Sequence, residues 1–291
     1  MNIEADFRDA MRGAGIETDA PIVADSVLHR IHVAGDRGNS KNGWYVLHND
    51  NHPAGRFGCN KRTIDITWRA GSITPLNPQQ RAVIEEQRRA RAIEQERGYM
   101  ITADGAGKIL RAANSDATEQ AYIVRKGVRT FGVNQNCDGV LVVPVYDART
   151  GKLQSLQFID GEGTKRFLPG GRLSFGCFPL RHTLQSFKEA VERRIGLAEG
   201  YATAATLARA LGPSIATFAA FSAGNLANVA TALREHYPKA EITLFGDNDE
   251  SGVGQAAAIK AATTVRGLVA IPPTPGTDWN DAQCNLARGA T

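Results

Sequence analysis

The chain has 291 residues, of which 42% are hydrophobic and 22% are charged. This composition is typical of a globular protein of about two domains, so a wholly disordered chain is excluded. The longest apolar runs, such as 139–145 and 214–221, are far shorter than the roughly 20 residues that cross a bilayer. We therefore expect a cytoplasmic protein with no membrane partner. The four cysteines form no C-x-x-C pair, which argues against a zinc ribbon and a disulfide framework.

The formal net charge is +4 at pH 7, which permits a nucleic-acid partner without requiring one. The charge is not spread evenly along the chain. Residues 149–190 carry seven basic and three acidic side chains, whereas residues 191–291 carry eight basic and nine acidic ones. A surface that faces nucleic acid is therefore expected within 149–190.

Residues 1–75 are expected to form a small α+β module. A short helix at 7–14 precedes two strand-like segments at 27–33 and 43–47. Three aromatic side chains are expected to supply its core: Trp44, Phe57 and Trp68. We find no catalytic signature in this part of the sequence.

Residues 76–98 are predicted to form a linker helix that ends at Gly98. Most of its side chains are charged or polar. This indicates a solvated helix with ion pairs between residues four apart, such as Glu85 and Arg89. The alternative is that three basic side chains contact nucleic-acid phosphates: Arg88, Arg89 and Arg91.

Residues 99–190 are expected to form a second α+β lobe. The pattern predicts helices at 108–113 and 121–126 and strands at 140–145, 153–159 and 164–167. The sequence DARTG between the first two strands is typical of a hairpin turn. The third strand leads into a basic loop that ends with the sequence PGGR.

The last part of the chain, 191–291, alternates short apolar strands with helices. The strands are expected at 195–198, 215–220, 241–245 and 268–271, and the helices at 202–211, 224–236 and 252–265. Such alternation is typical of the α/β class, in which helices cover a doubly wound parallel sheet. This is the part of the fold that the sequence determines best.

Acidic residues follow two of these predicted strands. Glu199 comes directly after the first strand, and Asp247 and Asp249 come after the third. Because the carboxyl ends of parallel strands meet at one edge of a sheet, we expect these side chains to share a pocket. Grouped carboxylates suit Mg²⁺ or Mn²⁺ and chemistry such as phosphoryl or nucleotidyl transfer. The alternative for Asp249 is that its side chain caps the following helix.

The order of these features resembles the Toprim domain, which has a Glu after its first strand and an Asp-x-Asp after its third. The flanking sequences are similar to those of Toprim primases from plasmids, integrative elements and satellite phages. The segments that carry this resemblance are KRFLPGGR (165–172), GCFPL (176–180), AEGYATAATLARALG (198–212), FSAGNL (221–226) and GDNDESGVGQAAAIKAA (246–262). The sequence at 28–50 also resembles a module at the front of such proteins. The resemblance covers most of the chain.

The resemblance implies a primase that makes short RNA primers on single-stranded DNA from nucleoside triphosphates, with Mg²⁺ or Mn²⁺. It implies catalytic and metal-binding roles for Glu199, Asp247 and Asp249, and a metal-binding role for Asp278. Nucleotide- or DNA-binding roles are expected for Lys165, Arg166, Arg172, Tyr201 and Asp281.

Two other functions remain open at this point. A Toprim nuclease would use the same carboxylates to activate water, and a non-catalytic accessory protein would only bind single-stranded DNA. The sequence contains no G-x-x-x-x-G-K-[ST] motif, so a replicative helicase would be a separate partner.

Overall fold

The computed structural model describes residues 2–38, 40–49, 53–62, 64–70, 78–114, 116–180 and 194–289. The chain divides into two compact units, residues 1–84 and 85–291. Each unit has a hydrophobic core of its own. The finer division that we expected at residues 75, 98 and 190 stays a prediction.

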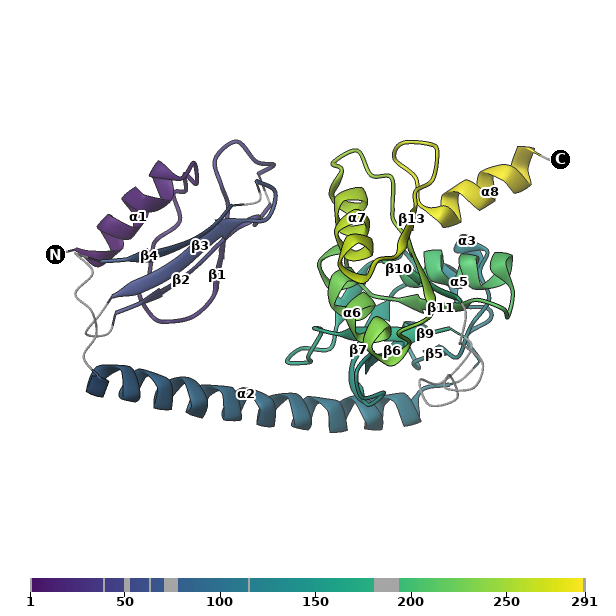
Figure 1. Ribbon diagram of the computed structural model, residues 1–291, viewed down its shortest axis with the longest axis horizontal. Helices are drawn as coiled ribbons and strands as arrows, with labels where there is room; N and C mark the ends of the chain where they lie inside the picture. Colours follow the sequence, from purple (N-terminus) through teal and green to yellow (C-terminus); the bar gives the residue numbers. More distant parts are fainter. Residues whose placement is uncertain are drawn as a thin grey trace. The chain divides into compact units, whose positions relative to one another are not determined.

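The N-terminal unit packs helix α1 (Ile3–Gly13) against an antiparallel sheet with the order β1-β2-β3-β4 (Figure 1). The strands in the described residues are β1 (His29–Ile31), β2 (Gly43–His48), β3 (Ala54–Cys59) and β4 (Ile64–Arg69). The rings of Tyr45, Phe57 and Trp68 surround Phe7 of the helix. The mixed α+β character expected for this region is therefore confirmed.

The aromatic core of this unit differs from our expectation at one position. Phe57 is buried and Trp68 packs against the core, as expected. Trp44 is only partly buried, because alternate residues of a strand point to opposite faces and the buried set of β2 is Tyr45 and Leu47. The prediction for Trp44 is wrong.

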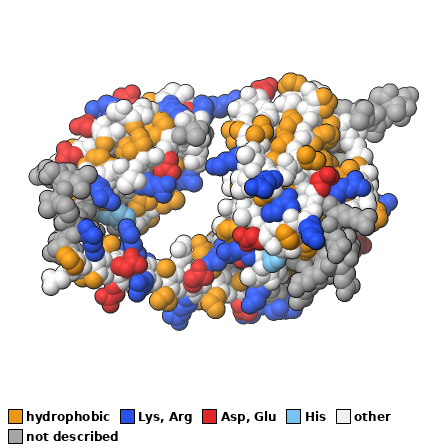
Figure 2. Space-filling view, in the orientation of Figure 1, with side chains coloured by type: hydrophobic (Ala, Val, Ile, Leu, Met, Phe, Trp, Pro, Cys, Tyr) orange, Lys and Arg blue, Asp and Glu red, His pale blue; other side chains and the backbone are white. Residues whose placement is uncertain are grey.

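Helix α2 (Pro78–Ala112) is longer than the sequence indicated. It runs for 35 residues and joins the predicted linker helix to the helix expected at 108–113. The helix end expected at Gly98 is wrong. Glycine disfavours a helix by only about 1 kcal/mol relative to alanine, and the C-terminal turns of α2 gain apolar contacts through Ala106, Ile109 and Leu110. Figure 2 shows basic, acidic and apolar side chains mixed along the exposed helix, and the expected ion pair between Glu85 and Arg89 forms at 3.5 Å.

A single mixed sheet forms the framework of the C-terminal unit (Figure 1). Its order within the described residues is β13-β12-β10-β11-β9-β6-β7-β8, and β5 pairs with β6. The strands are β5 (Asn134–Gln135), β6 (Leu141–Asp147), β7 (Leu153–Ile159), β8 (Lys165–Phe167), β9 (Gly176–Pro179), β10 (Arg194–Ala198), β11 (Ala216–Ala219), β12 (Glu241–Phe245) and β13 (Leu268–Ala270). Strands β13, β12, β10 and β11 are parallel, as expected, and the remaining pairs are antiparallel.

The parallel and antiparallel strands belong to one continuous sheet. β9 pairs antiparallel with both β11 and β6, so the parallel strands continue into the antiparallel ones. The sheet is therefore mixed rather than wholly parallel.

Helices cover both faces of the parallel strands (Figure 1). They are α3 (Ala121–Lys126), α5 (Tyr201–Leu211), α6 (Leu226–His236), α7 (Val253–Val265) and α8 (Trp279–Gly289), with a 3-10 turn at Ala223–Asn225. Apolar residues of α6 and α7 pack with Ile195, Leu197 and Leu244, whereas those of α3 and α5 pack with Ala198 and Ala219 on the other face. This places the carboxyl ends of β10 and β12 side by side at one open edge. No helix among the described residues is long and apolar enough to cross a membrane.

Candidate active site

Two carboxylates meet at the carboxyl edge of the parallel strands. β10 and β12 are neighbours, and Ala198 lies opposite Phe245, so Glu199 and Asp247 leave the sheet at the same edge. Burial, together with the negative charges of Glu199 and Asp278, raises the pKa of Asp247 to about 7. Glu199, Asp278 and Asp249 thus all lie close enough to Asp247 for their charges to act on it.

Glu199 combines burial with a positive neighbour. Burial raises the pKa of its carboxyl group, while the backbone N–H of Ala223 and the charge of Lys165 oppose that rise. Its backbone oxygen accepts a hydrogen bond of 2.7 Å from the N–H of Phe221. The residue is therefore fixed between the ends of β10 and β11, with a carboxyl group that accepts a proton more readily than an exposed one.

Asp247 also has a buried carboxylate oxygen, Oδ1, without a hydrogen-bond partner. Such an oxygen is costly unless an ion or a ligand satisfies it. Among the residues that the structure describes, no three His, Cys, Asp or Glu side chains are grouped so as to hold a metal by themselves. Mg²⁺ commonly binds through one or two carboxylates together with water and substrate phosphates. Asp247 and Glu199 fit that mode of binding.

Asp249 has a structural role that we considered as an alternative. Its Oδ1 accepts hydrogen bonds from the Ser251 hydroxyl and the Val253 N–H, and its Oδ2 accepts one of 2.7 Å from the Gly254 N–H. Burial opposes ionisation, yet these hydrogen bonds lower its pKa overall. The side chain caps the start of α7. Its carboxylate oxygens therefore have fewer lone pairs available to bind a metal than those of Asp247.

Asp278 and Asp281 begin helix α8. The N–H of Asp281 donates to Asp278 Oδ1 at 2.8 Å, and Lys126 lies 3.2 Å from Asp281 and 4.0 Å from Asp278. The side-chain amide of Asn280 donates to the Lys126 carbonyl and the Thr206 hydroxyl, both at 2.8 Å. These contacts fix the start of α8 to α3 and α5, so Asp278 faces the acidic pair while Asp281 neutralises Lys126.

A cavity of about 250 Å³ opens next to the carboxylates. It lies at the start of α5, where Gly200 is the N-cap. Its lining includes three basic residues, two acidic residues and two hydroxyl-bearing residues: Arg125, Lys126, Lys165, Glu162, Asp278, Tyr122 and Thr203. Basic side chains and free N–H groups at a helix start are suited to phosphate.

Comparison with known proteins identifies relatives of this chain. Residues 194–288 match the family model of the Toprim domain. This part of the chain is a Toprim domain. The expectation drawn from Glu199, Asp247 and Asp249 is therefore confirmed at the level of the fold.

Two curated relatives extend the similarity beyond the Toprim domain. The chain is 35% identical over 286 residues to a DNA primase TraC of Escherichia coli, which covers 92% of this chain and 26% of that protein. It is 34% identical over 291 residues to a second DNA primase TraC of Escherichia coli, which covers 94% of this chain and 20% of that protein. The chain thus spans about a quarter or less of the length of these relatives.

A solved structure is also similar, at a lower level. It is the primase fragment of the bacteriophage T7 primase-helicase protein, with a TM-score of 0.43 and 18% identity. The similarity covers 57% of this chain and 70% of that one. A likeness of this size supports no conclusion about the site.

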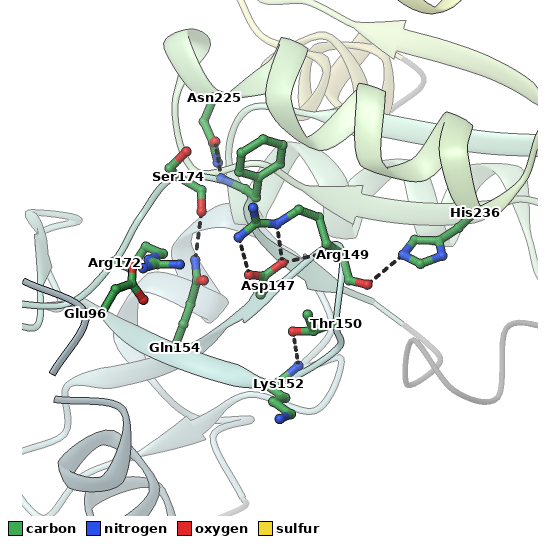
Figure 3. Close-up of polar contacts among 11 residues, drawn as sticks. Glu96, Asp147, Arg149, Thr150, Lys152, Gln154, Arg172, Ser174, Asn225 and His236 are labelled. Carbon is green, nitrogen blue, oxygen red and sulfur yellow. Dashed lines mark hydrogen bonds and ion pairs between the residues drawn. The ribbon is translucent and has the colours of Figure 1, made fainter. Parts of the chain in front are cut away.

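The basic residues expected to face nucleic acid do not lie together. Lys165 lines the cavity beside the Toprim carboxylates. Arg166 pairs with Phe158, which packs toward α2, and so lies on the opposite face of β8. Arg172 forms an ion pair with Glu96 of α2 (Figure 3). Its guanidinium also lies over the ring of Tyr99, 4.6 Å from the ring centroid.

Arg149 also contacts other residues of the same unit through its side chain. Its guanidinium forms a bidentate pair with Asp147 at 2.7 and 3.1 Å, and lies 4.2 Å from the ring centroid of Phe175 (Figure 3). Part of the basic excess of residues 149–190 therefore stabilises the unit itself. Of the three basic residues that we expected to bind nucleotide or DNA, Lys165 alone lies at the acidic edge among the described residues.

Tyr201 does not have the role that we expected. Its side chain is 0% exposed, its hydroxyl donates to the Arg129 carbonyl at 3.0 Å, and that hydroxyl accepts from the Phe131 N–H. A buried ring cannot stack on a nucleotide, so this prediction is wrong. Conversely, the sequence did not point to Arg125 and Lys126, since the cavity forms only when α3 packs against α5 of the Toprim domain.

Proposed function

We propose that the chain is a primase, which joins ribonucleotides on a single-stranded DNA template. The observation that carries the proposal is the group of acidic residues Glu199, Asp247 and Asp278 at the edge of a Toprim domain, beside a cavity whose lining includes Lys165 and Arg125. The 35% sequence identity to a DNA primase over 286 residues supports the proposal. Mobile-element replication or conjugation in the cytoplasm is the setting that we propose.

In the proposed reaction, some residues bind the triphosphate and another accepts a proton. Lys165 and Arg125 would bind the triphosphate in the cavity, and Thr203 would donate a hydrogen bond to it. Glu199 would take the proton of the attacking 3′-hydroxyl, a role that its raised pKa favours. The 3′-oxygen then bonds to the α-phosphorus, the bond to the β-phosphate oxygen breaks, and pyrophosphate leaves.

A divalent cation belongs to this proposal. Asp247 and Glu199 would hold Mg²⁺ or Mn²⁺, with Asp278 nearby and Asp249 limited by its role at α7. Such an ion would neutralise charge on the phosphates during transfer. Without it, the two carboxylates would repel the triphosphate that the basic walls attract.

A primer-synthesis assay on short single-stranded templates with labelled nucleotides tests the function. We expect Glu199→Gln to lower the rate of synthesis by about 100-fold or more, the usual range for a lost general base. Asp247→Asn should do so as well. Glu119→Gln removes a carboxylate charge from an exposed position of the same unit and should leave synthesis unchanged.

The same assay addresses the other two functions. If labelled DNA is shortened when nucleotides are omitted, the protein is a nuclease and the proposal is wrong. If the wild type binds the template but extends nothing, it is a binding accessory. Adding a replicative helicase on a forked template tests whether such a helicase is a partner, because a functional pair should synthesise more primer than the protein alone.

A further inference from the structure

Two aromatic rings lie beside the acidic edge, outside the residues used so far. Phe167 belongs to β8 and Phe221 follows β11, and both side chains are partly exposed. Their ring centroids are 6.0 Å apart with an interplanar angle of 84°. The backbone N–H of Phe221 donates to the backbone carbonyl of Glu199 at 2.7 Å, so the chain at Phe221 runs beside the chain at Glu199.

Phe167 also shares a strand face with the cavity. Residues two apart on a strand point to the same side, so Phe167 and Lys165 face the same way on β8. Their partners on β7 are Gln157 and Ile159, on the face that packs with α3 and α5. Two strand residues span roughly 7 Å, which is the scale of the separation between a base and its own 5′-phosphate. One short strand therefore presents a cation and a ring at a spacing that suits a nucleotide.

The backbone at Phe221 is in an unfavourable conformation. Its φ is +68°, in the left-handed region that residues with a Cβ rarely adopt. Phe175, on a neighbouring loop, has a φ of +59°. Such outliers persist only where the surrounding structure fixes them, and they are concentrated at functional sites.

A single buried side chain fixes both of these turns. Asn225, 8% exposed, donates from Nδ2 to the Ala220 carbonyl at 2.9 Å and to the Gly176 carbonyl at 2.8 Å. Its Oδ1 accepts from the Phe175 N–H at 3.0 Å (Figure 3). The chain entering Phe221 is thus tied to the loop before β9, so the ring is held in place at the edge of the site.

We propose that Phe167 and Phe221 form a stacking surface for the base of the nucleoside triphosphate whose phosphates enter the cavity. This inference rests on the proposed function and adds to it the recognition of the base. Both rings lack polar atoms, so the contact is by stacking and does not read the hydrogen-bonding edge of the base. The surface would accept any of the four bases, as primer synthesis on a varied template requires.

Isothermal titration in the presence of Mg²⁺ tests the proposal, with ATP and inorganic tripolyphosphate as the two ligands. Phe167→Leu keeps an apolar side chain and removes the ring, and we expect it to weaken ATP binding by about 10-fold, the size of one lost stacking contact. Phe167→Tyr keeps the ring and should retain wild-type affinity. Tripolyphosphate has no base, so its affinity should be the same in all variants.

Phe221→Leu and Phe158→Leu complete the set. Phe221→Leu should weaken ATP binding in the same way as Phe167→Leu. Phe158 lies on the neighbouring strand but packs on the opposite, α2-facing side, so Phe158→Leu is the matched control and should change neither affinity. Circular dichroism confirms that each variant is folded before titration.

Three outcomes would overturn the inference. Equal weakening of ATP and tripolyphosphate would mean that the ring only supports the shape of the cavity. Unchanged ATP affinity with weaker binding of a single-stranded oligonucleotide would assign the rings to the template. Unchanged affinity for every ligand would remove the stacking role while leaving primer synthesis, and hence the proposed function, intact. If the wild type neither binds ATP nor extends primers, the proposed function itself is wrong and the inference is lost with it.

Discussion

The carboxyl group of Asp247 is destabilising in its charged form. Burial, together with the negative charges of Glu199 and Asp278, raises its pKa from the ordinary 3.8 to about 7. Folding therefore favours the protonated form. The associated stability is fully present below the ordinary pKa and is lost as the pH rises through about 7. At neutral pH, repulsion between these negative charges destabilises the metal-free protein.

From this we predict that Asp247→Asn stabilises the metal-free protein at pH 8 while it lowers the rate of primer synthesis. Asparagine has a similar shape and no charge, so the repulsion disappears at every pH. Denaturant unfolding at pH 5 and pH 8 measures the effect: the wild type should lose more stability over this range than the variant. Glu119→Gln is the control and should follow the wild type at both values. A variant that is less stable than the wild type at pH 8 would contradict the account.

The residues of the site were predictable only in part. Glu199, Asp247 and Asp249 follow strands that are recognisable from local apolar runs, so their position at one edge of the sheet was predictable from the sequence. The sequence could not decide whether the Asp249 carboxylate binds a metal or accepts hydrogen bonds from the N–H groups of α7, since that depends on the loop conformation. Tyr201 was misplaced because a tyrosine after a strand can face either the solvent or the core.

At the scale of elements, helix α2 shows how packing outweighs a local signal. The sequence has glycines at 98, 105 and 107, which favoured two helices with a break, yet one helix forms. Its last turns pack on Val142 and Leu156 of the sheet, and those contacts come from distant parts of the chain. Likewise, the parallel strands were predictable because each carries its own apolar run. The insertion of β9 between β11 and β6 was not predictable, since strand pairing over such a sequence distance leaves no local pattern.

We predict that Gly105→Ala raises the free energy of unfolding by roughly 0.5–1 kcal/mol, because alanine restricts the unfolded chain and favours the helix. A Cβ at this position meets nothing within 4 Å. Gly246→Ala is the informative contrast, because a Cβ there would lie 2.6 Å from Ile271 Cδ1 and 2.7 Å from Ala258 Cβ. It should lower the stability by about 1–3 kcal/mol through overpacking. Thermal denaturation compares the two, and stabilisation by both changes would show that the packing of α7 is looser than described.

At the scale of the whole molecule, the candidate site lies within one of the two compact units. Residues 1–84 have a core built around Phe7 and Phe57, whereas the acidic edge and the cavity belong to residues 85–291. Ligands that bind only the native form stabilise the unit that holds their site. Because the described residues contain no group of three metal-binding side chains, a metal and a nucleotide should each bind weakly alone and more tightly together.

Differential scanning calorimetry should therefore show two unfolding transitions, of which Mg²⁺ and ATP shift only one. The shift with both ligands should exceed the sum of the separate shifts, since the triphosphate completes the coordination that Asp247 and Glu199 begin. Phe57→Ala removes a fully buried ring from the N-terminal unit and should lower the other transition alone, which assigns the two. Asp247→Asn should abolish the joint shift, and Glu119→Gln should preserve it. A single transition that responds to both the ligands and Phe57→Ala would instead mean that the two units unfold as one, and additive shifts would mean that metal and nucleotide occupy separate sites.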